Sequence, residues 1–140
     1  MQKAKPIVCF LLLIGFSLLL VGCNTKDSKP EKVKEIEFTV VEDADVPEKL
    51  MEIINERKSK PFKITYTDED KEYLYIIVGY GEQPTGGYSI SIDELYLADN
   101  VIYLDTNLIG PSQEEFVSNA VTYPYVVIKT EYMDKRVLFD

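Results

Sequence analysis

The segment YLYIIV at residues 73–78 is a short, continuous run of aromatic and aliphatic side chains. A run of this length and composition is typical of a central strand that is covered on both faces. A charged turn at residues 68–70 precedes it, and before that turn apolar and polar residues alternate from Phe62 to Tyr66. The two stretches together predict a β-hairpin in which YLYIIV is the buried strand.

The two-residue period continues on both sides of this hairpin. Ile36, Phe38 and Val40 alternate with polar residues, which predicts a half-buried strand near the start of the domain. Further strands are predicted at residues 89–97, 101–106, 125–132 and 137–139.

The alternation changes phase inside the strand predicted at residues 89–97. Ile92 and Leu95 are three positions apart and would point to opposite faces of a regular strand. We therefore expect a β-bulge at Asp93 and Glu94, which would return both side chains to the core face.

One helix is predicted between the first strand and the hairpin. Asp45 is a suitable N-cap with Glu48 three residues later, and Leu50 and Ile54 lie on one face of the helix that follows. It should run for about three turns and end near residue 59.

The segment at residues 111–122 does not favour one state clearly. Ser112 followed by Glu115 is similar to a helix cap, whereas the apolar residues between Phe116 and Val121 suit a helix or a strand. We expect extended structure.

The elements together predict an α+β fold. It should be mainly antiparallel β, a curled sheet of barrel-like or sandwich-like form with one packed helix. The 140 residues are enough for one domain, which we place at residues 35–140.

The N-terminus has the pattern of a lipoprotein signal peptide. Lys3 and Lys5 precede an apolar run at residues 7–21. Leu20, Val21 and Gly22 then directly precede Cys23. This run is shorter than the roughly 20 residues of a membrane-spanning helix, so we expect cleavage of residues 1–22 and acylation of Cys23, for example with palmitate. The expected location is the extracytoplasmic side of the cell membrane, with lipid bound through Cys23.

Charge is strongly negative after this cleavage. The 15 basic residues include two in residues 1–22, so 13 bases and 24 acids remain and the balance is 13 − 24 = −11. Residues 23–34 are polar and charged, with almost nothing to bury, and we expect a disordered tether. Between Glu72 and Ile128 the chain has eight acids and no base. These acids either attract cations or a basic partner or pair with lysines elsewhere, and they argue against nucleic acid as a partner.

The chain contains no histidine. This excludes catalytic triads and dyads that use an imidazole base and removes the commonest transition-metal ligand. No acidic run has EF-hand spacing. We therefore expect a non-catalytic protein with no metal and no cofactor.

The most distinctive stretch runs from Gln83 through Pro84, Thr85, Gly86 and Gly87 to Tyr88. Proline restricts the backbone and the glycines allow positive φ, so this candidate binding loop should have one defined shape. If Gly86 needs positive φ, a valine there should destabilise the loop. The free N–H groups could cradle an anion, but a purely structural turn is the simpler interpretation.

A second landmark, Tyr123-Pro124-Tyr125, follows at a distance. We expect it at a strand start or edge, because proline cannot donate to a β-ladder. In this order the two landmarks resemble the C-terminal domain of the PrcB family, the protease complex subunit proteins, over about residues 73–132. The resemblance implies a secreted or envelope protein that binds or stabilises another protein, such as a secreted protease.

Two alternatives to protein binding stay open. The ten tyrosines could form a platform for carbohydrate or a cell-wall polymer, and the acids could form a carboxylate-based hydrolase. A protein-binding domain should show an exposed apolar patch beside the candidate loop or an open sheet edge. A sugar module should show a tyrosine-lined trough, and a hydrolase should show two facing carboxylates.

Overall fold

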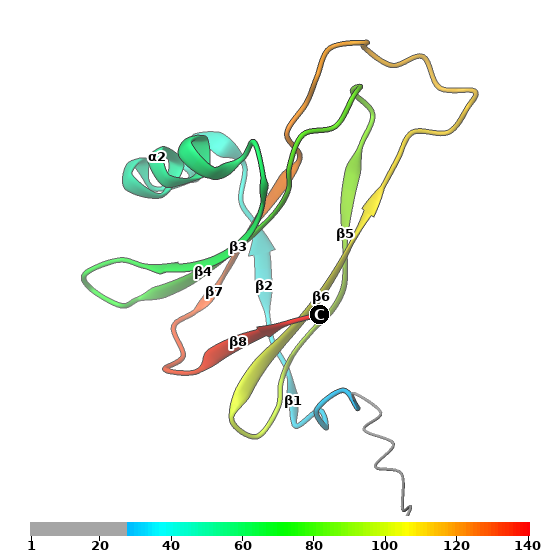
Figure 1. Cartoon of the computed structure of the whole chain (residues 1–140). Helices are drawn as coiled ribbons and strands as arrows, with labels where there is room; N and C mark the ends of the chain where they lie inside the picture. Colours follow the sequence, from blue (N-terminus) through cyan, green and yellow to red (C-terminus); the bar gives the residue numbers. More distant parts are fainter. Residues whose placement is uncertain (1–27) are drawn as a thin grey trace, which may run out of the picture.

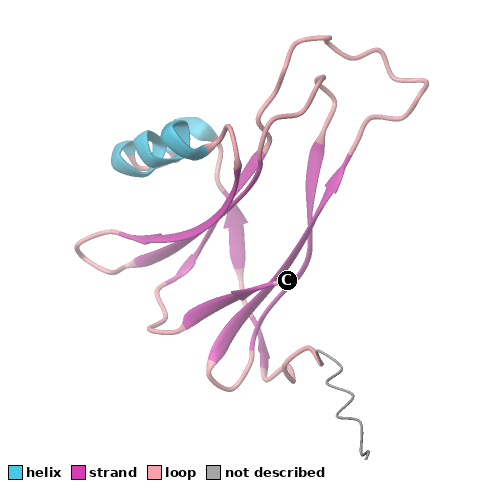
Figure 2. Ribbon diagram, in the orientation of Figure 1, coloured by secondary structure: helices cyan, strands magenta, loops and turns pink. Residues whose placement is uncertain are grey.

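The computed structural model describes residues 28–140, which form two four-stranded sheets and one α-helix (Figures 1 and 2). The strands are β1 (Lys34–Glu35), β2 (Phe38–Val40), β3 (Pro61–Thr67), β4 (Tyr73–Tyr80), β5 (Ser89–Leu97), β6 (Val101–Ile109), β7 (Tyr125–Glu131) and β8 (Arg136–Phe139). The helices are the 3-10 turn η1 (Asp43–Asp45) and the α-helix α2 (Glu48–Arg57).

The strand order is β1-β5-β6-β8 in one sheet and β2-β7-β4-β3 in the other. All pairs are antiparallel except β6 with β8, which is parallel. The predicted bulge is confirmed, because the β5–β6 register shifts between Ile92 and Glu94. The sheets curl toward each other without closing, which confirms the predicted α+β class with a sandwich-like form and one packed helix (Figure 2).

The hydrophobic core has two layers, one on each face of the β4–β7 pair. Alternate residues of β4, such as Ile76 and Val78, pack between the two sheets against Ile102 and Leu104 of β6. The intervening residues, such as Ile77, face α2. Burial on both faces explains why β4 is a continuous apolar run.

Helix α2 covers the outer face of its sheet through Leu50 and Ile54, which are fully buried. The predicted N-cap is wrong. Asp45 lies in η1, and the helix starts after Pro47, which is the N-cap residue without a side-chain hydrogen bond. Proline disfavours helical geometry in the residue before it, and Val46 is extended (φ −75°, ψ 133°), so the chain cannot enter the helix earlier.

The strand predicted around Ile36 is interrupted. Glu35 pairs with β5 in one sheet, and Phe38 pairs with β7 in the other, so the chain crosses between the sheets at residues 36–37. Phe38 and Val40 are 41% and 52% exposed, so the apolar face expected for this strand is only partly covered. Their strand is at a sheet edge, where no further strand covers the side chains.

The C-terminal part of the predicted tether contacts the folded domain. Lys29 forms an ion pair with Glu94 at 2.8 Å, and the Tyr96 hydroxyl donates to the Pro30 carbonyl at 2.7 Å. These residues cover the outer face of the β5–β6 hairpin, where Tyr96 and Tyr103 stack with ring centroids 4.9 Å apart. These contacts could not be predicted from the composition of residues 23–34, which is polar and charged. Residues 1–27, with the predicted signal peptide and Cys23, lie outside the described part.

Residues 111–122 form an irregular loop with neither a helix nor a strand. The capping contact predicted from Ser112 and Glu115 is present, because the Ser112 N–H donates to the Glu115 carboxylate at 2.8 Å. It closes a turn and no helix follows. The only β-contact of the loop is the single bridge between Thr122 and Gln83.

Candidate functional site

The two sequence landmarks meet at one end of the sandwich. Residues 81–88 connect β4 to β5, and residues 110–124 connect β6 to β7; we call them the loop pair (Figure 1). Gln83 and Thr122 exchange two backbone hydrogen bonds of 2.8 and 3.0 Å. The Thr122 hydroxyl also donates to the Thr85 carbonyl at 2.6 Å. The loops therefore support each other through backbone and side-chain hydrogen bonds.

Gly87 is the glycine that this geometry requires. Its φ is +83°, and a Cβ there would lie 2.5 Å from Val117 Cγ1 and 2.9 Å from Pro111 Cβ. Gly86 has no positive φ, and its Cβ would make an ordinary contact of 3.6 Å with Ser118. The expectation that Gly86 needs positive φ is therefore wrong, and the requirement belongs to its neighbour.

Backbone donors of the candidate loop are already used within the protein, including one of those that could cradle an anion. The Gly86 N–H donates to the Ser118 carbonyl at 2.9 Å, and the Gln83 N–H is used by Thr122. Donors that are already paired within the protein cannot bind a ligand without losing those bonds. This supports the structural interpretation of the glycines.

Tyrosines near the loop pair have separate roles within the fold. The Tyr80 hydroxyl shares a 2.7 Å hydrogen bond with Thr106, which joins the two sheets below the loops. Tyr125 starts β7, and its hydroxyl donates to the Asp43 carboxylate at 2.6 Å. Burial and this carboxylate raise the pKa of Tyr125 above its ordinary value. Tyr88 packs over Gly110. The side chains of these three tyrosines contact three different parts of the fold instead of one continuous trough.

The second landmark lies where the sequence predicted. Pro124 directly precedes β7, and its carbonyl accepts the Tyr80 N–H at 3.0 Å. Tyr123 is half-buried, with the Lys58 ammonium 6.0 Å from its ring centroid. This segment therefore holds the start of β7 against the end of β4.

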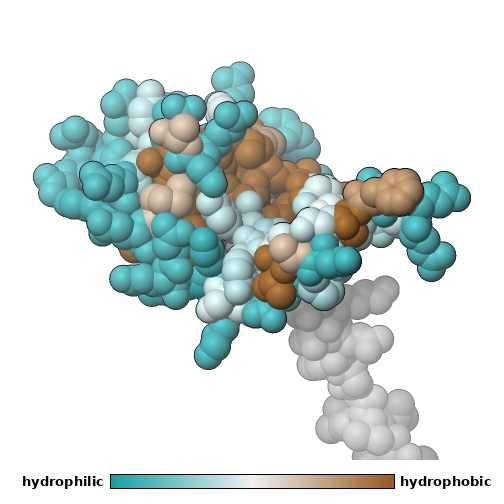
Figure 3. Space-filling view, turned by 90° about the horizontal axis from the view of Figure 1, so that it is seen from above, coloured by the Kyte–Doolittle hydropathy of each residue, from teal (hydrophilic) through white to brown (hydrophobic). Residues whose placement is uncertain are grey.

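The outer surface of the loop pair carries exposed apolar side chains. Phe116 is fully exposed and Val121 is 48% exposed, and Ile109, the last residue of β6 before this loop, is also 48% exposed. Figure 3, which looks onto this end of the molecule, shows apolar surface gathered between hydrophilic side chains. This exposure was not predicted, because Phe116 suits a buried position in either a helix or a strand.

Two carboxylates of the segment without lysine or arginine, residues 72–128, form ion pairs with a lysine outside it. Lys29 lies 2.8 Å from Glu94 and 3.7 Å from Asp105. For these two acids, the expectation of pairing with lysines elsewhere in the chain is correct. Glu114 and Glu115 are exposed and directly precede Phe116. Acidic side chains therefore lie next to the exposed phenylalanine of the loop pair.

Within residues 28–140, no helix is long and apolar enough to cross a membrane. No group of three or more cysteine, aspartate or glutamate side chains in the same residues has the geometry of a metal site.

Comparison with known families gives one match. The family model described as PrcB C-terminal matches residues 74–131, from β4 to the end of β7. The match includes the whole loop pair and both landmarks. No curated protein and no solved structure gives a significant match.

Proposed function

We propose that this protein is a non-catalytic subunit that binds another protein of a protease complex, because the PrcB C-terminal family model matches residues 74–131. The observation that carries the proposal is the fully exposed Phe116 at the tip of the loop pair. Large aromatic side chains are unfavourable in water and are enriched at the centres of protein interfaces. The partner that we propose is a secreted protease or another envelope protein.

The loop pair is suited to binding because it is ordered before any partner arrives. The loop that bears Phe116 is fixed to the candidate loop through Thr122 and Ser118, whose contacts with Gln83 and Gly86 are described above. An ordered loop loses less conformational entropy on binding than a flexible one. In this interpretation, the two sequence landmarks build the support, and Phe116 makes the contact.

Attachment to the membrane is part of the same proposal. The lipobox pattern that ends at Cys23 supports a lipid anchor on the extracytoplasmic side of the membrane. The domain would then be held close to secreted and envelope proteins. Cys23→Ser should abolish acylation and release the protein or leave it unprocessed. Mass spectrometry of the N-terminus checks this, and a Cys23→Ser protein that is still processed and retained in the membrane would exclude the anchor.

Site-specific photo-crosslinking tests the binding function. A benzophenone amino acid in place of Phe116 should crosslink one partner in intact cell envelopes, and mass spectrometry should identify a protease or a protease-associated protein. The matched control carries the same group at Glu56, which is exposed on α2 and is not part of the loop pair. Equal, diffuse labelling from both positions would contradict the proposal.

A further inference from the structure

Strand β2 has one free edge. It pairs with β7 on one side, and no other described strand pairs with it. The Val41 N–H donates to the Val127 carbonyl, so the backbone groups of residues 39 and 41 face β7. In an antiparallel ladder this direction alternates from residue to residue. The N–H and C=O groups of Phe38 and Val40 therefore point away from the sheet.

The free edge is short, but it lacks several other features that protect natural edge strands from pairing. These features include a proline, an inward-pointing lysine and a bulge. Strand β3, at the opposite edge of the sheet, begins with Pro61 and has Lys63, whose ammonium donates to the Asp140 carbonyl at 2.7 Å. Strand β2 has none of these features and instead presents the half-exposed side chains of Phe38 and Val40.

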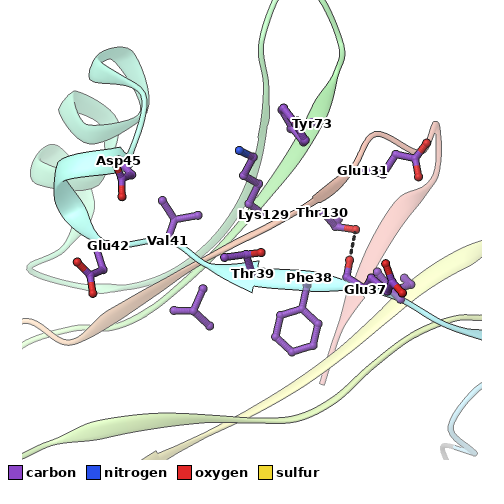
Figure 4. A pocket seen from close by; sticks show the side chains of 12 residues that line it. Glu37, Phe38, Thr39, Val41, Glu42, Asp45, Tyr73, Lys129, Thr130 and Glu131 are labelled. Carbon is purple, nitrogen blue, oxygen red and sulfur yellow. Dashed lines mark hydrogen bonds between the residues drawn. The ribbon is translucent and has the colours of Figure 1, made fainter.

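A groove of about 1160 Å³ runs along this edge (Figure 4). Four carboxylates line it, and its single base, Lys129, is held over the Tyr73 ring with 3.9 Å between Nζ and the centroid. The four acids are Glu37, Glu42, Asp45 and Glu131. The groove therefore combines unpaired backbone groups, apolar side chains and an excess of negative charge.

We propose that the β2 edge binds an extended segment of a partner protein in which apolar residues alternate with lysine or arginine. The segment would add a fifth strand to the sheet by pairing with the backbone of Phe38 and Val40. Successive side chains of a strand point to opposite faces. The apolar residues would lie beside Phe38 and Val40, and the basic residues would face the side of Glu37 and Glu131. This site shares no residue with the loop pair and does not rest on the function proposed above.

Charge favours such a segment over a second copy of this chain. Pairing of two β2 edges would bring the four carboxylates of one copy close to those of the other. The chain after residue 22 also carries a balance of 13 − 24 = −11, so two copies repel each other over longer distances. A basic segment is attracted by the same charges.

The test uses the purified full-length protein in detergent and a synthetic peptide, acetyl-Lys-Val-Lys-Val-Lys-Val-amide, with binding followed by fluorescence anisotropy. We expect saturable binding that weakens with added salt, and no binding of the peptide with glutamate in place of lysine. The protein variant is Val40→Pro, which removes one edge N–H that does not face β7, and its matched control is Val40→Thr, which keeps that N–H. Loss of one or two backbone hydrogen bonds should weaken binding by about tenfold in Val40→Pro only.

A second measurement covers the case in which Val40→Pro fails to fold. The same basic peptide with N-methyl groups on its valines cannot donate to the β2 edge, and it should lose binding to the unaltered protein. Equal binding of the methylated and unmethylated peptides, or equal binding of the acidic and basic peptides, would overturn the proposal. Concentration-dependent dimerisation of the protein that disappears in Val40→Pro would also overturn it, because the edge would then belong to a second copy.

Discussion

At the scale of single residues, Gly87 shows how a sequence motif maps onto backbone geometry. Gly87→Ala should destabilise the protein by about 1–3 kcal/mol, because alanine is strained at positive φ and its Cβ would collide with Val117 and Pro111. The control is Gly86→Ala, whose Cβ has room. Urea denaturation should show a lower midpoint for Gly87→Ala alone. Equal midpoints for the two variants would mean that the loop can rearrange without cost.

Tyr103 gives a pH-dependent prediction at the same scale. Burial and the hydrogen bond to the Asp140 carboxylate raise the pKa of Tyr103 to about 12, against an ordinary value of 10.0. The folded state therefore holds this proton more tightly than the unfolded state. The resulting stability is fully present below pH 10 and is lost as the pH rises toward about 12.

The free energy of unfolding, measured by urea denaturation at several pH values, should fall between pH 10 and about 12. Tyr103→Phe has no proton to lose at this position, so its free energy of unfolding should fall less steeply over the same range. Tyr66, Tyr73, Tyr75, Tyr96 and Tyr125, whose pKa values are also raised, contribute to the remaining slope. Parallel curves for the two proteins would show that Tyr103 does not contribute.

At the scale of elements, helix α2 depends on the residues that it buries. Leu50 is fully buried against the outer face of the β4–β7 pair. Leu50→Ala should lower the free energy of unfolding by about 2–5 kcal/mol, because it removes buried methyl groups and leaves a cavity. Lys49→Ala is the control on the exposed face of the same helix. Similar losses in both variants would show that the helix is only loosely attached to the sheet.

The sequence predicted elements best where the physical signal is local. Alternation identified the strands, and the phase change located the bulge next to Asp93, because both depend on residues a few positions apart. The helix start was wrong, since the extended geometry imposed at Val46 by the following proline outweighs the capping preference of Asp45. The parallel β6–β8 pair was not predicted, because strand direction depends on how the chain crosses between the sheets.

For the candidate site, too, the local features could be predicted from the sequence and the non-local features could not. The loop landmarks were visible because glycine and proline have strong local preferences. Neither the exposure of Phe116 nor the free edge of β2 could be predicted, because each depends on which distant segments do not cover it. For β2, the decisive fact is that the chain leaves one sheet after Glu35 and joins the other at Phe38. Exposure of this kind is a property of the assembled fold.

At the scale of the whole molecule, the segment that matches the family model is only part of the folding unit. Residues 74–131 include β4 to β7, but the outer face of the β4–β7 pair is covered by α2, and both edges of this pair are occupied, by β2 and β3. Removing those elements would expose Tyr75, Ile77 and Val127 to water. The matched segment therefore needs the residues before it to complete its core.

A fragment of residues 73–132 should consequently not fold alone, whereas a fragment of residues 28–140 should unfold in a single cooperative transition. The shorter fragment loses the helix layer, the edge strands β2 and β3 of one sheet, and the edge strands β1 and β8 of the other. Circular dichroism and urea titration of both fragments check this, with 8-anilinonaphthalene-1-sulfonate fluorescence as a measure of exposed apolar surface. Cooperative unfolding of residues 73–132 with a midpoint close to that of the longer fragment would mean that β4–β7 form an independent core. The helix layer would then be an accessory to the segment that matches the family model and not a part of its folding unit.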